Sequence, residues 1–210
     1  MQNLEGRQRL AIVALRIWLF GSFLGAVSGA MYIVVLSGTG TIWSPAAGRF
    51  VDQTAMATGL VYLAALVFAA VCVGRWIHRA SANAHAVSDT MSISPGWSVG
   101  WYFVPFANLV KPFQAMREIW QVSIAPGDPA SVPVPSLLRW WWGLWLLSNI
   151  LGNISFRLAG TGAGIGQVIA SSWVDIVTFG VDAALTVALI RIIRQLTANQ
   201  RSMVDASVFE

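Results

Sequence analysis

The long apolar run from Leu10 to Leu36 constrains the fold of this chain more than any other feature. A helix needs about 20 predominantly apolar residues to cross a bilayer, and this run exceeds that length with Arg16 as its one charged residue. It is also far longer than the apolar stretch of about 7–15 residues in a secretory signal peptide. We therefore expect a retained membrane-spanning helix near the N-terminus.

The composition of the whole chain agrees with this expectation. Of the 210 residues, 56% are hydrophobic and 10% are charged, whereas about 25% charged residues are usual in soluble domains. The formal net charge is +4, but Lys and Arg stand at the ends of apolar segments, where they control topology and attract anionic lipid headgroups. Nucleic-acid binding is therefore not expected. Cys72 is the single cysteine, which excludes an internal disulfide.

Four segments satisfy the length and apolarity expected of a spanning helix, at about residues 10–36, 56–77, 137–154 and 165–193. Together with their connections they form one expected membrane domain, residues 1–196. The polar residues 197–210 are expected to form a disordered tail. The predicted fold class is an all-α membrane protein with four transmembrane helices.

The orientation of these spans follows from the positions of Lys and Arg, which favour the cytoplasmic side. A fifth span over residues 96–110 would leave five of these residues inside and seven outside. With four spans and both termini in the cytoplasm, ten lie inside, namely Arg7, Arg9, Arg75, Arg79, Lys111, Arg117, Arg139, Arg191, Arg194 and Arg201, and two outside, Arg49 and Arg157. The sequence therefore predicts four spans and cytoplasmic N- and C-termini.

The segment from residue 94 to 124 is apolar but poorly suited to crossing a bilayer. Its apolar part, residues 97–110, covers only about 21 Å at 1.5 Å per residue, and Pro105 and Pro112 interrupt helical hydrogen bonding. We expect a re-entrant or interfacial element on the cytoplasmic side, either dipping into the bilayer or lying on it. From Pro112 onward we expect an amphipathic surface helix whose apolar face holds Phe113, Met116, Trp120 and Ile124. A cytosolic helix that covers the bundle is the alternative.

The run SPGWSVGWYFVPFANLVKPFQAMREIW resembles a bacterial family of multi-pass membrane proteins that is classed only as a domain of unknown function. The resemblance covers roughly residues 60–195. It implies a helical fold in the bacterial cytoplasmic membrane, and it provides no site residues to carry over to this chain. The most characteristic residues, which form a cytoplasmic-side motif, are Pro95, Trp97, Pro105, Asn108, Lys111, Pro112, Glu118 and Trp120.

A polar stripe runs along the last predicted span. Ionisable residues within a span are costly and are functional-site hypotheses by default. The stripe is a proton or cation path, a polar substrate site, or a structural network that pairs with donors on neighbouring helices. Its members lie at offsets that place them on one helical face: Ser171, Asp175, Thr178, Asp182 and Thr186.

Arg16 is the predicted partner of one acid in this stripe. From the positions of Arg16 and Asp182 within their spans, their Cα heights differ by about 6 Å, which is within side-chain reach. We therefore predict an Arg16–Asp182 ion pair. Asp175 has no cationic partner at its depth.

Two further patterns predict contacts between the spans. Asn149 and Asn153 lie four residues apart in the third span, with Ser148 adjacent, and this group is expected to hydrogen-bond to the acidic stripe. Gly21, Gly25 and Gly29 repeat every four residues in the first span. They predict the close approach of another helix, within the bundle or in a homodimer.

Eight tryptophans are expected at the cytoplasmic interface, which is more than an ordinary aromatic belt requires. They form a predicted collar where the 94–124 element meets the third span. Packing is the expected role, and a quinone or lipid-tail site is the alternative. The eight are Trp76, Trp97, Trp101, Trp120, Trp140, Trp141, Trp142 and Trp145.

The two histidines, His78 and His85, predict no metal site. Seven residues apart on one helix, they are separated by about 10.5 Å along its axis. No metal and no cofactor are therefore expected.

Three function classes follow from these observations. The first is a non-enzymatic assembly or regulatory component of the bilayer, with a homodimer or another membrane protein as its partner. The second is a small oligomeric proton- or cation-coupled transporter or channel that uses Asp175 and Asp182. The third is a lipid-active enzyme at the cytoplasmic interface, with Glu118, His78 or Lys111 in its site.

Overall fold

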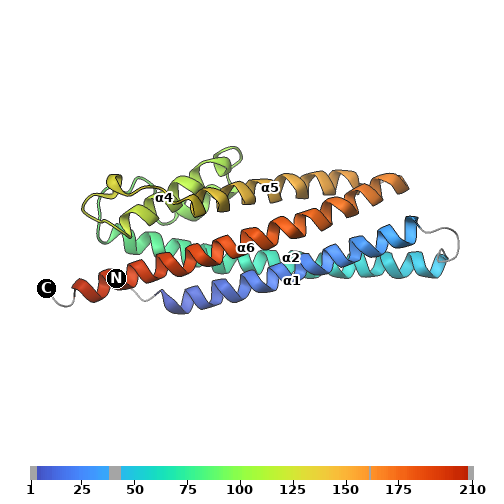
Figure 1. Ribbon diagram of the computed structural model, residues 1–210, viewed down its shortest axis with the longest axis horizontal. Helices are drawn as coiled ribbons and strands as arrows, with labels where there is room; N and C mark the ends of the chain where they lie inside the picture. Colours follow the sequence, from blue (N-terminus) through green and yellow to red (C-terminus); the bar gives the residue numbers. More distant parts are fainter. Residues whose placement is uncertain (1–3, 38–43, 161, 208–210) are drawn as a thin grey trace. The chain divides into compact units, whose positions relative to one another are not determined.

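The computed structural model describes residues 4–37, 44–160 and 162–207, the last four of these by their backbone alone. Within these ranges the chain is helical and contains no strand (Figure 1). The helices are α1 (Glu5–Ser37), α2 (Pro45–His85), α3 (Trp97–Gly100), η1 (Trp101–Phe103), η2 (Ala107–Leu109), α4 (Lys111–Val122), η3 (Pro129–Ser131), α5 (Ser136–Leu158) and α6 (Ile165–Ser207). The predicted all-α fold is confirmed.

Local sequence explains where several helices begin. The first turn of α1 carries Glu5, where a carboxylate is favoured by the helix dipole. Ser44 precedes α2 and its Oγ accepts a hydrogen bond from the backbone N–H of Ala47 at 3.1 Å. Pro45 and Pro112 stand in the first turns of α2 and α4, where the missing N–H of proline removes no helical hydrogen bond.

The chain forms two compact units, and α1, α2, α5 and α6 each contribute residues to both. The first unit comprises Met1–Ala14, Ala69–Trp142 and Val187–Glu210. The second comprises Leu15–Phe68 and Gly143–Thr186.

In the second unit, α1 and α2 lie antiparallel. Near the end of α1, the hydroxyl of Tyr32 donates a 2.8 Å hydrogen bond to Asp52 near the start of α2. Eleven residues earlier in α1, a Cβ on Gly21 would lie 3.2 Å from the Cα of Tyr62. The absence of a side chain at Gly21 therefore allows the two backbones to approach closely.

The same part of α1 also lies antiparallel to α6. The hydroxyl of Ser22 donates a 2.7 Å hydrogen bond to Asp182, and a Cβ on Gly29 would lie 3.2 Å from the backbone oxygen of Ser172. Because both partners run against α1, α2 and α6 run in the same direction in this unit. Close helix approach within the bundle is thus confirmed at Gly21 and Gly29, whereas Gly25 has no atom within 4 Å of its Cβ position.

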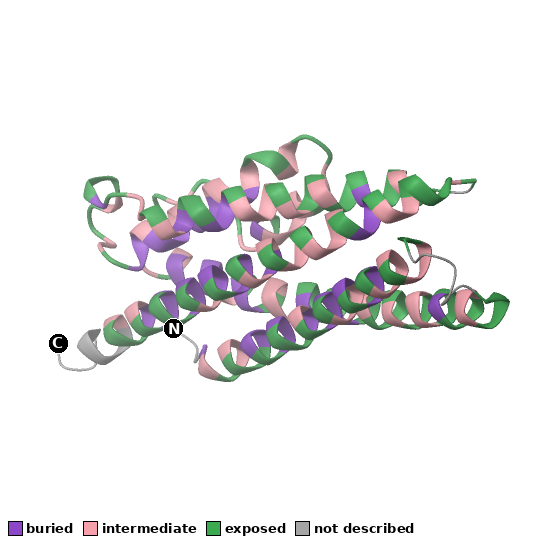
Figure 2. Ribbon diagram, turned by 45° about the vertical axis from the view of Figure 1, so that its right-hand side comes forward, coloured by how far each residue is buried: buried purple, intermediate pink, exposed green. Residues whose placement is uncertain are grey.

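Three helices, α1, α2 and α6, are long and apolar enough to cross a membrane. The prediction of four such helices is wrong for α5, which covers the third predicted span. This helix has 23 residues, but four tryptophans, two asparagines, two glycines and Arg139 lower its hydropathy. Figure 2 shows exposed positions along all the long helices, and only 17% of the most apolar window of α2 is buried.

The predicted disordered tail is wrong for residues 197–207, which continue α6 in the first unit. Thr197 is buried, and its Oγ1 accepts a 3.1 Å hydrogen bond from Nε1 of Trp76. Gln200 is also buried, and its Nε2 donates to the carbonyl oxygen of Ala80 at 2.9 Å. These polar side chains are held because their hydrogen-bond partners are buried with them.

The amphipathic helix α4 buries a face that differs in part from the predicted one. Met116 and Trp120 are buried as expected, but Ile124 is 48% exposed because α4 ends at Val122. The buried face instead includes Pro112, Ala115, Met116, Ile119 and Trp120. Protein in the first unit covers this face, as the alternative interpretation of a helix covering the bundle expects.

Candidate functional site

The most enclosed ionisable side chain of the predicted polar network is that of Asp182 on α6. Its residue is 0% exposed, and its two carboxylate oxygens accept hydrogen bonds from different helices. Ser22 of α1 donates to Oδ2 at 2.7 Å, and Ser148 of α5 donates to Oδ1 at 2.7 Å. Asp182 therefore joins three helices of the second unit through one carboxylate.

The second acid of the stripe repeats the contact with α5 one heptad away. The hydroxyl of Ser155 on α5 donates to Oδ1 of Asp175, which is partly exposed. Ser148 and Ser155 are seven residues apart on α5, and Asp175 and Asp182 are seven apart on α6. Because seven residues make almost two helical turns, two antiparallel helices bring both pairs into register. Equal serine and aspartate spacings are the sequence signal that would have identified Ser155.

The predicted asparagine contacts are wrong. Asn149 and Asn153 are exposed on α5, and their amides donate to backbone oxygens of the same helix, at Trp145 (2.7 Å) and Asn149 (2.9 Å). Ser171 and Thr178 also donate within their own helix, to Val168 and Val174. Serines, with shorter side chains, make the contacts between helices in place of the asparagines.

The predicted Arg16–Asp182 ion pair is wrong. Arg16 is exposed, whereas Asp182 is fully buried and receives its hydrogen bonds from Ser22 and Ser148. Height along the helix axis was the basis of the prediction, but direction around the axis decides the contact. Six residues at about 100° each place Arg16 about 120° around α1 from Ser22, which faces the carboxylate.

In the first unit, the carboxylate of Glu118, a residue of the cytoplasmic-side motif, binds the chain at residues 92–93, just before the motif begins. This carboxylate accepts hydrogen bonds from the backbone N–H of Ser92 at 3.0 Å, from the hydroxyl of Ser92, and from the N–H of Ile93 at 3.2 Å. The two oxygens are thus engaged by three donors. This geometry gives Glu118 an anchoring role in the fold.

The aromatic part of the motif combines packed and exposed side chains. Trp97 and Trp101 stack with their ring centroids 4.5 Å apart, and Nζ of Lys111 lies 6.0 Å from the Trp101 ring. Ser98 is buried, and its hydroxyl donates to the carbonyl oxygen of Pro95 at 2.7 Å. Nearby, burial raises the pKa of the Tyr102 hydroxyl above its ordinary value, because the phenolate would lose its hydration.

A sharp turn follows at Pro105. Phe106 has φ 63° and ψ −41°, and the N–H of Ala107 bonds to the carbonyl oxygen of Pro105 at 2.7 Å, which closes a three-residue γ-turn. Phe106 is 85% exposed, and Phe103 is 79% exposed. A positive φ costs a non-glycine residue about 1–3 kcal/mol, so the turn displays an aromatic ring at the expense of local strain. Asn108 follows this turn and is half-buried.

The tryptophan collar is packed at the start of α5. Trp142 lies 6.3 Å from the ring of Phe113 and 5.5 Å from that of Trp141, and its Nε1 donates to the carbonyl oxygen of Leu109 at 3.2 Å. Trp76, Trp120, Trp141 and Trp142 are buried, whereas Trp97 and Trp140 are exposed. The expected contact between the 94–124 element and the third span is therefore present within the first unit. His, Cys, Asp and Glu side chains form no metal-type cluster among the described residues.

Comparison with known proteins identifies a family for the chain. No curated protein and no solved structure matches it. The family described as "Domain of unknown function (DUF4328)" matches residues 40–198, which begins 20 residues before the resemblance seen in the sequence. That match includes the whole cytoplasmic-side motif, both acids of the stripe and the serines on α5. The chain belongs to this DUF4328 family.

Proposed function

We propose that the protein is a non-enzymatic, multi-pass component of the bacterial cytoplasmic membrane that assembles with, or regulates, another membrane protein or a second copy of itself. One observation carries this proposal, the closure of the Asp182 site by Ser22 and Ser148. A group that carries protons or cations must reach solvent on each side in turn, and Asp182 is 0% exposed. Its hydrogen bonds favour a fixed helix junction.

The direction of the helices supports passage of α5 through the bilayer, although α5 is less apolar than α1, α2 and α6. In the second unit α2 and α6 run the same way, so the chain between them must return to the starting side. The 23 residues of α5 make a helix of about 35 Å, which exceeds a hydrocarbon core of about 30 Å. Its serines pair with the acids of α6, which reduces the cost of polar groups at membrane depth.

The charge distribution supports cytoplasmic N- and C-termini and an anionic lipid surface next to them. Ten of the Lys and Arg residues counted above then face the cytoplasm, where they meet anionic headgroups. On this side the exposed rings of Phe103 and Phe106 would insert at the membrane interface, so that the 94–110 segment is an interfacial element. Nucleic acid is not a proposed partner.

The topology is tested by single cysteines in a Cys72→Ser background. Gly127→Cys precedes α5 and Gly160→Cys follows it, and both positions are exposed. In intact cells a membrane-impermeant thiol reagent should label Gly160→Cys alone, and lysis should make Gly127→Cys reactive. Labelling of both positions from one side would refute the passage of α5 through the membrane.

The functional class is tested in proteoliposomes that hold the purified protein and a pH-sensitive dye. We expect no proton flux above that of empty liposomes, for the wild type and for Asp175→Asn alike. A flux that Asp175→Asn abolishes would overturn the proposal in favour of a transporter, because Asp175 is the more exposed acid of the stripe. Copurification from mild detergent, followed by native mass spectrometry, then identifies the partner or the homodimer.

A further inference from the structure

A charged cavity lies in the first unit, and its described lining includes neither the acids of the polar stripe nor Glu118. Its volume is about 300 Å³, and it lies between the N-terminal turns of α1 and the C-terminal part of α6. Neither the polar stripe nor the motif accounts for it. Among the residues that the structure describes, its polar lining consists of Glu5, Gln8 and Arg9 from α1 and of Arg194, Thr197 and Arg201 from α6.

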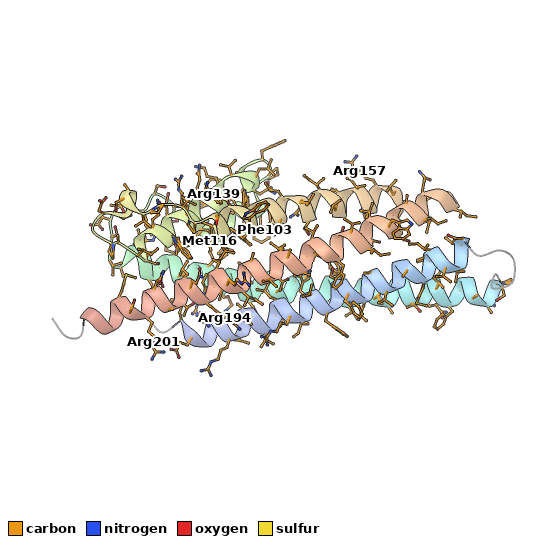
Figure 3. All side chains as sticks on the ribbon, viewed as in Figure 1. Phe103, Met116, Arg139, Arg157, Arg194 and Arg201 are labelled. Atoms are coloured by element: carbon orange, nitrogen blue, oxygen red, sulfur yellow. The ribbon has the colours of Figure 1, made fainter. Side chains whose placement is uncertain are left out.

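The spacing of these residues gives each helix one face toward the cavity. On α1 the lining residues Glu5, Gln8 and Arg9 lie at offsets of three and four. On α6, Arg194 and Arg201 lie seven residues apart and are labelled on that helix in Figure 3. Residues at these offsets share a helical face, so their side chains converge on one volume.

Among the described residues that line the cavity, three guanidinium groups meet one carboxylate, which gives this lining a positive charge. Nη1 of Arg201 lies 2.7 Å from Oε1 of Glu5, and both side chains are exposed, at 68% and 39%. An exposed ion pair of this kind contributes about 0–1 kcal/mol, so an incoming anion can compete for Arg201. Arg9 and Arg194 form no hydrogen bond or ion pair with the described residues.

Thr197 also belongs to the wall of the cavity. Thr197 is 4% exposed, and its Oγ1 accepts the indole N–H of Trp76 at 3.1 Å. Within the described ranges, no acceptor is found for its own hydroxyl hydrogen, which remains able to donate. Trp76 is fully buried and orients this oxygen, so Thr197 is held in place before any ligand arrives.

We propose that this cavity binds a phosphate group that carries two negative charges, as in a phosphomonoester. Arginine forks match the geometry of phosphate oxygens through paired hydrogen bonds, which a lysine cannot reproduce. In the described lining, three guanidinium groups and Glu5 give a charge excess of two, which a dianion neutralises and a carboxylate leaves half-balanced. A volume of about 300 Å³ accommodates the phosphate together with part of the group that bears it.

The phosphate belongs to a lipid headgroup or to a soluble molecule, and both present the same dianion. The α1 residues that line the cavity come before the apolar run that begins at Leu10. A lipid headgroup can therefore reach the cavity from the membrane surface, and a soluble phosphate can reach it from water. The site depends only on the charges and shape of the first unit. It therefore goes beyond the proposed assembly role and does not require it.

The test uses the full chain in nanodiscs of phosphatidylcholine, in a buffer without phosphate. Two probes are compared, inorganic phosphate measured by calorimetry and phosphatidic acid in the nanodisc measured by native mass spectrometry. The Arg9→Gln/Arg194→Gln variant should bind the effective probe roughly 100-fold more weakly, because each charged hydrogen-bond donor accounts for about a factor of ten. The matched control is Arg49→Gln/Arg157→Gln, which removes two exposed arginines of the second unit (Arg157 is labelled in Figure 3) and should leave binding unchanged.

A second variant separates the site from a loss of folding. Glu5→Gln removes the competing carboxylate and should bind the probe roughly threefold to tenfold more tightly, an effect that misfolding cannot produce. Retention of phosphatidic acid alone indicates a lipid source, and binding of inorganic phosphate indicates a soluble one. Binding of neither probe by the wild type, equal weakening by the control pair, or weaker binding by Glu5→Gln would overturn the proposal.

Discussion

The hydrogen bond between Ser148 and Asp182 gives the sharpest test of how the second unit is held together. The perturbation is the set Ser148→Ala, Asp182→Ala and the double variant. Single variants are ambiguous, because a buried carboxylate is itself costly and a freed serine can donate to its own helix backbone. The double-mutant cycle isolates the interaction between the two side chains.

The expected coupling energy between Ser148 and Asp182 follows from the geometry of their hydrogen bond. The donor–acceptor distance is 2.7 Å, and Asp182 is 0% exposed, so water does not screen the bond. Interhelical hydrogen bonds of membrane proteins have measured couplings averaging about 0.6 and reaching about 1.7 kcal/mol. A short and fully enclosed bond belongs in the upper half of that range, so we expect a coupling of about 1–1.7 kcal/mol.

The coupling is measured as the change in free energy of unfolding when the protein in mixed micelles is titrated with a denaturing detergent. The control cycle pairs Asn149→Ala with Asp182→Ala. Asn149 is the neighbour of Ser148 in the sequence, but it is exposed and bonds to its own helix, so its coupling should stay below about 0.5 kcal/mol. Equal couplings in the two cycles, or none in the first, would refute the serine–aspartate junction.

Three further predictions use the same unfolding measurement or amide exchange. Gly29→Ala should destabilise the protein by about 1–3 kcal/mol, because its Cβ would lie 3.2 Å from a backbone oxygen of α6. Gly25→Ala is its control, with no atom within 4 Å, and should stabilise by about 0.5–1 kcal/mol; the opposite order would contradict this packing. Phe106→Gly should stabilise by about 0.5–2 kcal/mol, since glycine relieves strain of about 1–3 kcal/mol at φ 63° but loses more chain entropy on folding, and a loss of stability would show that the ring itself is needed. Glu118→Gln should speed amide exchange at Ser92 and its neighbour roughly tenfold, because a charged acceptor is lost, and unchanged exchange would exclude the anchoring role.

In the cytoplasmic-side motif, the sequence predicts part of the local backbone geometry, and only the structure shows the rest. The prolines predict that residues 97–110 cannot form one straight helix, because each removes a backbone donor. The short helices α3, η1 and η2 agree with that prediction. The positive φ of Phe106 had no sequence signal, since phenylalanine rarely adopts it and only the surrounding contacts can hold it there.

For α4, too, the sequence predicts the kind of helix, and only the structure shows which residues are buried. Its periodicity predicts an amphipathic helix, and α4 is one. The end of the helix at Val122 decides that Ile124 is exposed and that Ala115 and Ile119 join the buried face. The sequence does not show whether the membrane or the rest of the protein covers such a face, because lipid tails and a protein core are both apolar.

By itself, the sequence determined the helical class, the three most apolar helices and the alignment of the acids along α6, because these depend on composition and on the period of a helix. It also identified the residues of the cytoplasmic-side motif, which lie within the family match. Tertiary structure alone decided the partners: serines in place of Arg16 for Asp182, an ordered helix after Thr197, and a cavity shared by α1 and α6. The physical reason is that helical spacing fixes which residues share a face, whereas the rotation and register of one helix against another fix which faces meet.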